Sequence, residues 1–278
     1  MLSSIKLKEL KLSLAVFNYL CMLSISVVII TKNEAINIAS CVRAAKQVSG
    51  DVIVADSGST DATIEIAEKE GARVIKIEWT GYGNARNAAA EVSINNWILA
   101  IDADERVTPS LVAEIRNIQK PDAKTVYGFM RENIFFGKKI RFGGNFGKDK
   151  VFRFYNKLFI KWDMAPVHEV LIGEGAMAKQ MIKGHLEHYT VREWKESEMK
   201  VYNYARLNAK KYFEQGRKST FIRRFLSPIV GFTKHYIILL GFLDGKAGFL
   251  VSYSNARCSY LKYKYLYEMN KQSKYIVQ

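Results

Sequence analysis

The chain has 278 residues, of which 49% are hydrophobic and 25% are charged. This composition is typical of a globular protein with a substantial core, and it excludes a chain that is disordered over most of its length. The three cysteines, Cys21, Cys41 and Cys258, are scattered and odd in number. They therefore predict neither a disulfide framework nor a metal-ligand spacing, and they suit a reducing cytosol.

The formal net charge of +15 is unevenly distributed along the chain. Residues 195–278 contain 16 Lys or Arg against five Asp or Glu, a net charge of +11, which leaves +4 for the rest. We therefore expect an electrostatic partner to dock on the C-terminal third. From charge alone, nucleic acid, anionic lipid and a phosphorylated acceptor are all candidates.

Strand and helix signals alternate from residue 25 onward. The β-branched run Ile25–Thr31 predicts a strand buried on both faces, and the following segment has Ile36, Ala39, Val42 and Ala45 at helical spacing. Strands are predicted at 25–31, 51–55, 73–77 and 97–101, and helices at 35–48, 60–70, 84–92 and from Thr108-Pro109 onward. This alternation predicts an α/β fold with a doubly wound, mostly parallel sheet and right-handed crossovers.

Polar residues follow three of the predicted strands. The strands end in Thr31–Glu34, Asp56–Ser59 and Asp102–Asp104. In open α/β sheets ligands bind beyond the carboxyl ends of the strands, so the three ends together predict a ligand site. Each end alone could be a turn or a helix cap, and Asp61 is interpreted as a first-turn acid favoured by the helix dipole.

The fourth strand runs directly into Asp102, Asp104 and Glu105. The period of two along a strand predicts that Asp102 and Asp104 point to the same side. Two such carboxylates repel unless a cation or a donor-rich ligand lies between them, and their oxygens suit Mg²⁺ or Mn²⁺ bridging a diphosphate. The chain has no G-x-G-x-x-G and no P-loop, so a metal with backbone or basic groups would hold the phosphate. The alternative is that these acids lie in a solvated turn between the strand and the following loop and bind no ligand.

Four motifs in this order and spacing resemble the inverting family-2 glycosyltransferases of the GT-A fold. They read VVIITKNEAINI, VIVADSGSTDAT, GYGNARNAA and WILAIDADE, and the resemblance covers residues 24–189. It is strongest to the bacterial subgroup that extends the lipopolysaccharide core, the β-1,4-glucosyltransferase type, because Val167-His168-Glu169 and the FLDGKAGF stretch at 242–249 also match.

The resemblance implies a binding site for a nucleotide sugar. Thr31 and Glu34 would line the nucleoside pocket, with Glu34 near the ribose. Asp56 would accept a hydrogen bond from the N3–H of uracil, and Arg86 would contact the diphosphate or the sugar.

The same resemblance implies the catalytic groups. Asp102 would lie near the ribose and the metal, Asp104 would bind Mg²⁺ or Mn²⁺ directly, and Glu169 would be the catalytic base. Because the T-E-D base motif of many members is absent, the base assignment depends on the H-E variant. His168 and His188 could assist at the diphosphate or the metal, or could be hydrogen-bonded core or rim residues.

The implied reaction transfers a single sugar, glucose or another hexose, from a UDP-sugar to a lipid-linked saccharide such as lipopolysaccharide core, with inversion to a β-linkage. The absence of a Q-x-x-R-W motif and of multiple transmembrane helices argues against processive synthesis. The alternatives are a related transferase with a peptide or other polysaccharide acceptor, and an inactive GT-A membrane scaffold. The aromatic and basic segment 127–162 could form the acceptor side or belong to the core, and Gly143, Gly144 and Gly147 suggest a mobile loop.

The C-terminal region is expected to be helical, basic and amphipathic. Residues 221–249 mix Arg and Lys with large apolar residues, which predicts a segment lying on an anionic membrane surface, and the alternative is a helix packed on the catalytic domain. No stretch reaches the ~20 apolar residues of a membrane span. No nucleic-acid module is recognised, so no nucleic-acid partner is expected.

We expect a cytoplasmic protein that is peripheral on the inner face of the cell membrane. The predicted domain organisation is an N-terminal extension at 1–21, with Met22 as an alternative start, a GT-A catalytic domain at 22–194 and the basic helical region at 195–278.

Overall fold

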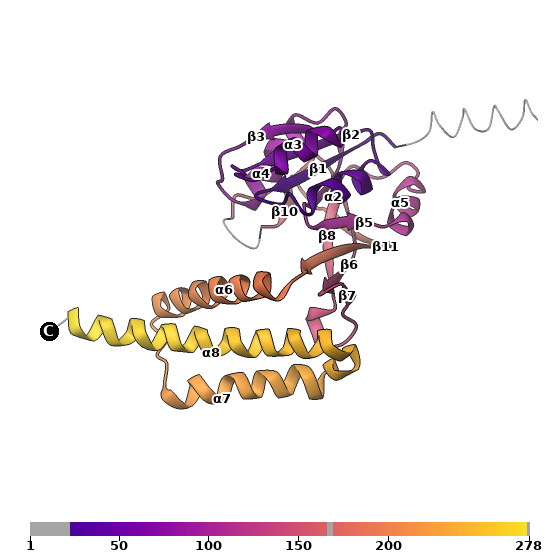
Figure 1. The fold of residues 1–278 in the computed structure, drawn as a ribbon. Helices are drawn as coiled ribbons and strands as arrows, with labels where there is room; N and C mark the ends of the chain where they lie inside the picture. The colour runs from indigo at the N-terminus through magenta and orange to yellow at the C-terminus, as the bar shows by residue number, and fades with distance from the viewer. Residues whose placement is uncertain (1–22, 166–168, 277–278) are drawn as a thin grey trace, which may run out of the picture. The chain divides into compact units, whose positions relative to one another are not determined.

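The structure is a computed structural model that describes residues 23–165 and 169–276, so the extension at 1–21 and His168 lie outside the described residues. Its first half is built on four parallel strands in the order β3-β2-β1-β4 (Figure 1). Their bounds are Ile25–Thr31 for β1, Asp51–Asp56 for β2, Arg73–Lys76 for β3 and Trp97–Asp102 for β4. All four predicted strands are present within one residue of the predicted bounds.

The predicted helices are also present: α2 (Ile38–Ala45), α3 (Thr63–Lys69), α4 (Tyr82–Glu91) and α5 (Pro109–Arg116). The first two begin three residues later than predicted, because turns precede them. The Glu34 carbonyl accepts hydrogen bonds from the amides of Asn37 and Ile38 in one such turn. Ile36, predicted on the apolar face of the first helix, precedes that helix and is exposed. Thr108 caps α5 as predicted, accepting a hydrogen bond from the Leu111 amide.

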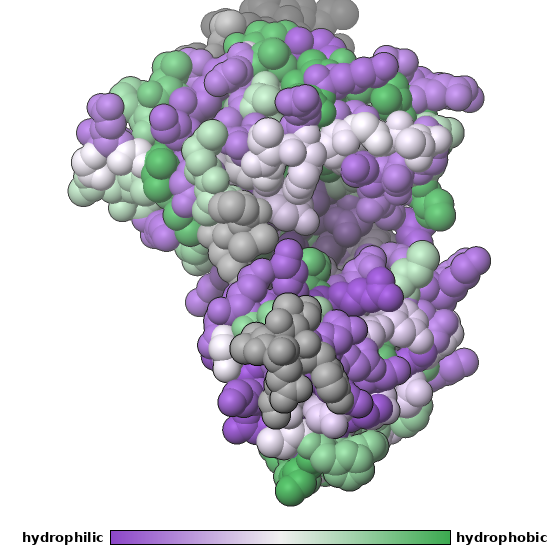
Figure 2. All heavy atoms as spheres, turned by 90° about the vertical axis from the view of Figure 1, so that its left-hand side faces the viewer, coloured by the Kyte–Doolittle hydropathy of each residue, from purple (hydrophilic) through white to green (hydrophobic). Residues whose placement is uncertain are grey.

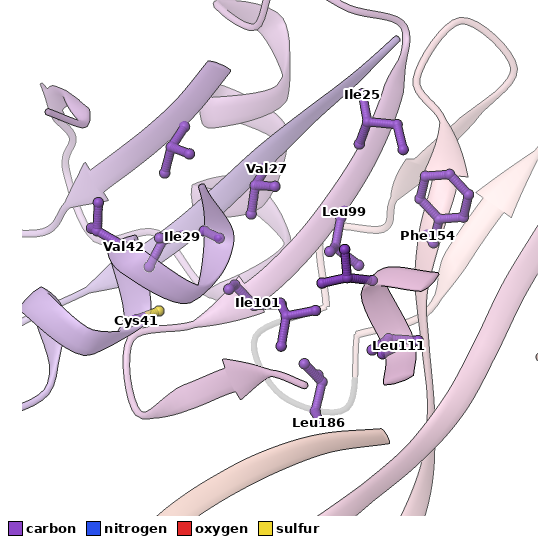
Figure 3. Packing of buried hydrophobic residues seen from close by; sticks show 14 of the residues in the cluster. Ile25, Val27, Ile29, Cys41, Val42, Leu99, Ile101, Leu111, Phe154 and Leu186 are labelled. Atoms are coloured by element: carbon purple, nitrogen blue, oxygen red, sulfur yellow. The ribbon is translucent and has the colours of Figure 1, made fainter. Parts of the chain in front are cut away.

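Helices cover both faces of the parallel strands. On one face, side chains such as Val27, Ile29 and Leu99 pack with Val42 of α2 and Leu111 of α5 (Figure 3). On the other face, the alternate side chains of the same strands pack against the alanines of α4. Each such buried aliphatic side chain contributes roughly 1.5–3 kcal/mol, so this two-sided core fixes the strand order and confirms the predicted doubly wound sheet.

The sheet continues past β4 with strands that the sequence pattern did not predict. The full order is β3-β2-β1-β4-β8-β6-β11-β5, and β8 pairs with β4 in the antiparallel direction. These strands are β5 (Glu105–Val107), β6 (Thr125–Phe135), β8 (Lys148–Asn156) and β11 (Ala178–Val191), with β7 (Lys138–Lys139) beside β6. A separate antiparallel pair consists of β9 (Ile160–Trp162) and β10 (Leu171–Gly173). In β8, Phe154 is fully buried between Trp97 and Tyr127, so it belongs to the core.

Two compact units make up the described chain. One extends to Met130 and includes Lys150–Glu187, and the other consists of Arg131–Asp149 and the chain from His188 onward. The second unit thus includes residues 131–149, which the predicted boundary at 194/195 assigns to the catalytic domain. Residues 131–149 belong to the second unit because the loop at 141–142 is bonded to the C-terminal region: the Asp244 carboxylate accepts hydrogen bonds from the amides of Arg141 and Phe142.

The second unit has the predicted helical character. Its helices are α6 (Trp194–Glu214), α7 (Phe221–Phe232) and α8 (Gly245–Ile276), and α6 and α7 both pack against α8 (Figure 1). Between α7 and α8 lie η2 (Thr233–Ile238) and η3 (Gly241–Asp244), and η1 (Gly144–Phe146) lies in the loop. Within the described ranges no single helix has the length and hydropathy of a membrane span. Within the same ranges, one pair of consecutive helices, Phe221–Ile238 and Gly241–Gln272, has the length and composition of a span when the two are taken together, and the pair is bent by 72°.

Candidate functional site

The ends of β1, β2 and β4 lie side by side at one edge of the sheet. In the register of the parallel pairs, Thr31 is opposite Asp56 and Ile30 is opposite Asp102. The three polar strand ends therefore meet at one edge, as predicted. The Ala103 amide also donates to the Ile30 carbonyl at 3.2 Å, which holds the chain after β4 beside the end of β1.

Asp56 organises the loop that follows β2. Its Oδ1 accepts hydrogen bonds from the amides of Gly58 and Ser59, both at 2.9 Å, and its Oδ2 accepts one from the Ser59 hydroxyl. Gly58 has a φ of +92°, which favours glycine at this turn. Each carboxylate oxygen has two lone pairs, so Oδ2 keeps acceptor capacity for one further N–H donor.

Thr31 and Glu34, predicted to line the nucleoside pocket, lie at the end of β1 and just beyond it. The Thr31 Oγ1 is buried and has no hydrogen-bond partner within the described part of the chain. Leaving such a hydroxyl unpaired costs about 1–3 kcal/mol, which a ligand group at this position would offset. The Glu34 carboxylate accepts a hydrogen bond from the Asn37 side chain at 2.6 Å.

The loops after β1 and β2 are tied together. The Asn33 amide donates to the Ser59 hydroxyl at 2.8 Å, and the Asn33 side-chain carbonyl accepts from the Thr60 amide at 2.8 Å. The φ of Asn33 is +55°, a conformation that asparagine tolerates better than most residues. The interpretation of Asp61 as a first-turn acid is wrong, because α3 begins at Thr63; Asp61 precedes the helix and accepts hydrogen bonds from the amides of Ala35 and Thr63.

Arg86 joins two of the predicted acids into one cluster. Its side chain is almost fully buried, with Nη2 2.7 Å from Asp102 Oδ1 and Nη1 2.5 Å from Glu169 Oε1. Arg153 lies on the other side of Asp102, with its Nη1 3.2 Å from Oδ1 and its Nη2 3.3 Å from Oδ2. Arg86 therefore has these carboxylates as its partners, and the predicted contact with the donor stays a prediction.

The indole ring of Trp162 in β9 packs against both arginines of this cluster. The guanidinium carbons of Arg86 and Arg153 lie 4.8 and 5.6 Å from the centre of its ring. Asn87 of α4 exchanges two hydrogen bonds with the Trp162 backbone, at 2.9 and 3.0 Å. A Cβ atom on Gly83 would lie 2.2 Å from the Asp163 carbonyl oxygen, so only glycine permits this packing. The G-N-A-R-N segment thus uses Gly83, Arg86 and Asn87 to fix α4 against β9.

The charges of the cluster stabilise one another. Burial alone would raise the pKa of Asp102, but the opposite charges of Arg153 and Arg86 outweigh it and hold that pKa well below its usual range. For Arg153, burial alone would lower the pKa, but the charges of Asp102 and Glu105 raise it above its usual value. Asp102 therefore remains ionised, and the two arginines compensate its charge.

Asp104 lies in the turn between β4 and β5 and is half-buried. The next residue, Glu105, is fully buried and accepts a hydrogen bond from the Asp102 amide at 2.9 Å, which fixes the turn. Over the described ranges, no group of three or more His, Cys, Asp or Glu is placed to hold a metal ion. Mg²⁺ is commonly bound by one or two carboxylates completed by substrate phosphates, and Asp104 fits a site of that kind.

Sequence reasoning missed Arg153 and Trp162. The structure pairs Glu169 with Arg86 and Arg153 with Asp102. The available signal was a charged residue between Phe152 and Phe154 in a strand. His188 lies in the other unit, where its Nδ1 is 2.7 Å from the Asn133 side-chain oxygen.

The family of the chain follows from comparisons with known proteins. The family model described as "Glycosyl transferase family 2" matches residues 26–173. The chain is 31% identical to an uncharacterized glycosyltransferase of Rickettsia conorii over 91% of this chain and 93% of that protein. It is also 24% identical to the lipopolysaccharide core biosynthesis glycosyltransferase LpsC of Rhizobium meliloti, over 88% of this chain and 93% of LpsC.

Among solved structures, the chain is similar to glucosyl-3-phosphoglycerate synthase from Mycobacterium tuberculosis in complex with Mn²⁺, UDP and glucosyl-3-phosphoglycerate. The identity is 24%, the TM-score is 0.31, and the match covers 41% of this chain and 44% of that one.

Proposed function

The chain belongs to glycosyl transferase family 2, and we propose that it transfers a single hexose from a UDP-sugar to a lipid-linked saccharide such as lipopolysaccharide core, with inversion to a β-linkage. The observation that carries this proposal is the edge where β1, β2 and β4 end. There, the residues that we assign to donor binding lie on adjoining elements, and Arg86 joins Asp102 of β4 to Glu169, which we assign as the base.

The nucleoside side of the site is formed by Thr31, Glu34 and Asp56. Asp56 has one acceptor position left for the imide N–H of uracil, and this favours a uridine nucleotide because cytosine and adenine present no imide proton. The unpaired Thr31 hydroxyl supplies a further polar contact. The hydrogen bonds among Asn33, Ser59 and Thr60 hold these groups in place before the donor binds.

Glu169 is the group that we assign as the base. Its Oε1 is fixed by Arg86, which leaves Oε2 to accept the proton of the acceptor hydroxyl as that oxygen attacks the anomeric carbon. Attack from the face opposite the diphosphate inverts the anomeric configuration. The proton passes to Glu169 and the nucleoside diphosphate leaves with the bonding electron pair, so the reaction needs no further reactant.

Asp104 is the residue that we assign to a divalent metal ion, Mg²⁺ or Mn²⁺. When bound, such an ion neutralises charge that develops on the leaving diphosphate. The protein's own contribution at this point is the fixed turn, in which Glu105 holds the Asp102 amide and Asp102 is held by two arginines.

A lipid-linked acceptor is supported by two observations. The similarity to LpsC, whose name assigns it to lipopolysaccharide core biosynthesis, extends over 88% of this chain. The net charge of +11 in residues 195–278 matches an anionic lipid surface. We place the enzyme in the cytoplasm, peripheral on the inner face of the cell membrane, in keeping with free thiols at Cys41 and Cys258.

The decisive experiment is a donor screen with the purified full chain. The protein is incubated with Mn²⁺ or Mg²⁺ and a panel of UDP-, GDP- and TDP-sugars, and released nucleotide is measured with and without a lipopolysaccharide core fraction. We expect release from one UDP-hexose, stimulated by the acceptor and abolished by EDTA. Release from a GDP-sugar alone would contradict the assignment of Asp56, and metal-independent release would contradict that of Asp104.

A further inference from the structure

Helix α7 has an inverted arrangement of polar and apolar residues. It buries none of its side chains, and its large aliphatic residues recur at helical spacing on the exposed side. Ile222 is 69% exposed, Ile229 is 62% exposed, and Leu226 and Val230 are more than half exposed. A helix on a water-facing surface normally has the opposite arrangement, because its apolar stripe packs on the core.

The side of α7 that faces α8 carries several small and polar groups. The Ser227 hydroxyl is 2.9 Å from that of Ser259, and Arg224 Nη2 donates to the Tyr260 hydroxyl at 2.7 Å. Gly231 lies beside Asn255, and Phe225 adds an aromatic contact with Tyr260. The contact between α6 and α8 is different, since Val201, Ala205 and Leu261 form a buried apolar cluster there.

The exposed apolar surface continues beyond the end of α7. Ile237 and Ile238 of η2 and Phe242 and Leu243 of η3 are all exposed. Figure 2 shows hydrophobic side chains at the lower end of the helical unit, where α7 lies in Figure 1. Exposed apolar surface this extensive marks an interaction site.

The charge around this surface identifies its partner. Residues 215–243 contain five Lys or Arg and no Asp or Glu. Arg217, Arg223 and Lys234 are exposed, and Asp244, the next acid along the chain, is engaged by the loop amides. An apolar face bordered by cations without acids is complementary to an anionic lipid surface.

We propose that the apolar face of α7, with η2 and η3, inserts into the interfacial layer of an anionic membrane. Ile222, Leu226 and Ile229 would enter the acyl region, while Arg223 and Lys234 contact phosphate headgroups. The helix lies along the membrane surface, and the polar contacts with α8 stay on the protein side. This proposal concerns the helical unit alone, and its test measures no transfer.

The test is vesicle flotation of the full chain with phosphatidylcholine vesicles, with and without phosphatidylglycerol. We expect binding only with the anionic lipid, weakened by salt. The double variant Ile222→Ser and Ile229→Ser should lower the partition coefficient on the order of tenfold or more, because it removes apolar contact but no charge. The double variant Arg223→Ser and Lys234→Ser should lower it by about fivefold per charge, at low salt only.

Two controls separate insertion through α7 from misfolding and from a general loss of apolar surface. Ile94→Ser replaces an isoleucine that is 76% exposed in the other unit, and it should bind vesicles like the wild type. Both isoleucines in the test variant are also exposed, so folding should be unaffected, as circular dichroism can verify. Ile229→Trp should show a blue-shifted emission on adding anionic vesicles.

Three outcomes would overturn the proposal. The first is equal binding by wild type and Ile222→Ser/Ile229→Ser. The second is concentration-dependent dimerisation that this variant abolishes, which would assign the face to a second copy of the chain. The third is wild-type protein in membranes that resists alkaline carbonate extraction, which would indicate that the bent pair of helices spans the bilayer.

Discussion

Arg86 and Glu169 form an ion pair, 2.5 Å between Nη1 and Oε1, that joins α4 to the segment before β10 across 83 positions of sequence. The other end of the same guanidinium contacts Asp102 at the end of β4. A planar guanidinium can donate to two carboxylates in fixed directions, which a lysine ammonium cannot do. Arg86 therefore sets the position of Glu169 relative to the strand edge.

The Glu169→Gln variant tests the assignment of the base. Glutamine keeps the size and an acceptor for Arg86 but cannot take a proton, so we expect transfer to fall roughly 10²–10⁴-fold. Binding of the UDP-sugar, measured by calorimetry, should be unchanged. Glu174→Gln changes an exposed acid just after β10; it is the matched control and should transfer normally. Near-normal turnover by Glu169→Gln would assign the base to another residue.

The Arg86→Lys variant separates positioning from charge. The lysine keeps one positive charge beside Asp102 but cannot span both carboxylates, so we expect kcat to fall by about 10²-fold with a smaller change in the KM for the donor. Breaking a buried pair costs roughly 3–5 kcal/mol, so the midpoint of urea unfolding should also fall. Arg43→Lys, which alters an exposed pair with Glu70, should change neither quantity. A defect in KM alone would indicate that Arg86 binds the donor.

The Asp104→Asn variant tests the metal assignment. The amide is a much weaker ligand than a carboxylate for a hard cation, so we expect transfer to fall at least tenfold and the Mn²⁺ concentration for half-maximal activity to rise. The affinity for Mn²⁺ in the presence of UDP should fall as well, a readout that does not depend on turnover. Glu65→Gln, an exposed acid on α3, is the control. An unchanged metal dependence would remove Asp104 from the metal site.

Asp51, at the start of β2, gives a prediction for stability against pH. Burial would raise its pKa, but hydrogen bonds from Ser26 and the Ile94 amide, with Arg73, outweigh burial and lower it. A lowered folded-state pKa contributes stability above the unfolded value of about 3.9, and this stability is lost as the pH falls toward the folded value. Asp51→Asn should therefore lower the free energy of unfolding by about 1.5–3 kcal/mol at pH 7. In urea titrations the difference from wild type should be constant from pH 7 to about 5 and shrink below pH 4. A difference that does not change with pH would contradict this.

The parallel half of the fold could be predicted from sequence because its signals are local. A β-branched run such as Ile25–Thr31 needs no distant partner to be identified, and Gly71 and Thr108 mark helix ends by their own conformational preferences. The strands β6, β8 and β11 were not predicted. They mix charged, aromatic and small residues, because each has long stretches that are only partly buried.

The sequence predicted which residues lie at the candidate site but not how their side chains pair with one another. Strand ends bring Thr31, Asp56 and Asp102 together, and the parallel topology alone predicts this. The pairing of Arg86 with Glu169 and of Arg153 with Asp102 depends on β8 and on the segment before β10, whose positions no local pattern specifies. For the same reason, the sequence predicted a cation or a donor-rich ligand beside Asp102 and Asp104 but not the two arginines that pair with Asp102.

The hydrogen bonds between Asp244 and the loop at residues 141–147 give a prediction for the local stability of that loop. The Asp244 carboxylate accepts from the amides of Arg141 and Phe142 at 2.9–3.1 Å, and the Gly143 amide donates to the Leu239 carbonyl at 2.9 Å. Asp244→Asn replaces one acceptor oxygen with an N–H group that faces these amides. Losing a charged hydrogen bond costs about 1.5–3 kcal/mol, so hydrogen exchange at residues 141–143 should accelerate roughly 10- to 100-fold.

Glu268→Gln, an exposed acid on α8, is the matched control for this substitution and should leave exchange in the loop unchanged. Exchange in β1 and β4, which belong to the other compact unit, should be unaffected in both variants. If the loop amides of Asp244→Asn exchange at the wild-type rate, the carboxylate does not hold the loop. The loop would then be held by its other contacts with η2 and the residue after it, which are the hydrogen bond from the Gly143 amide to the Leu239 carbonyl and the 3.1 Å contact between His235 Nδ1 and the Gly143 carbonyl.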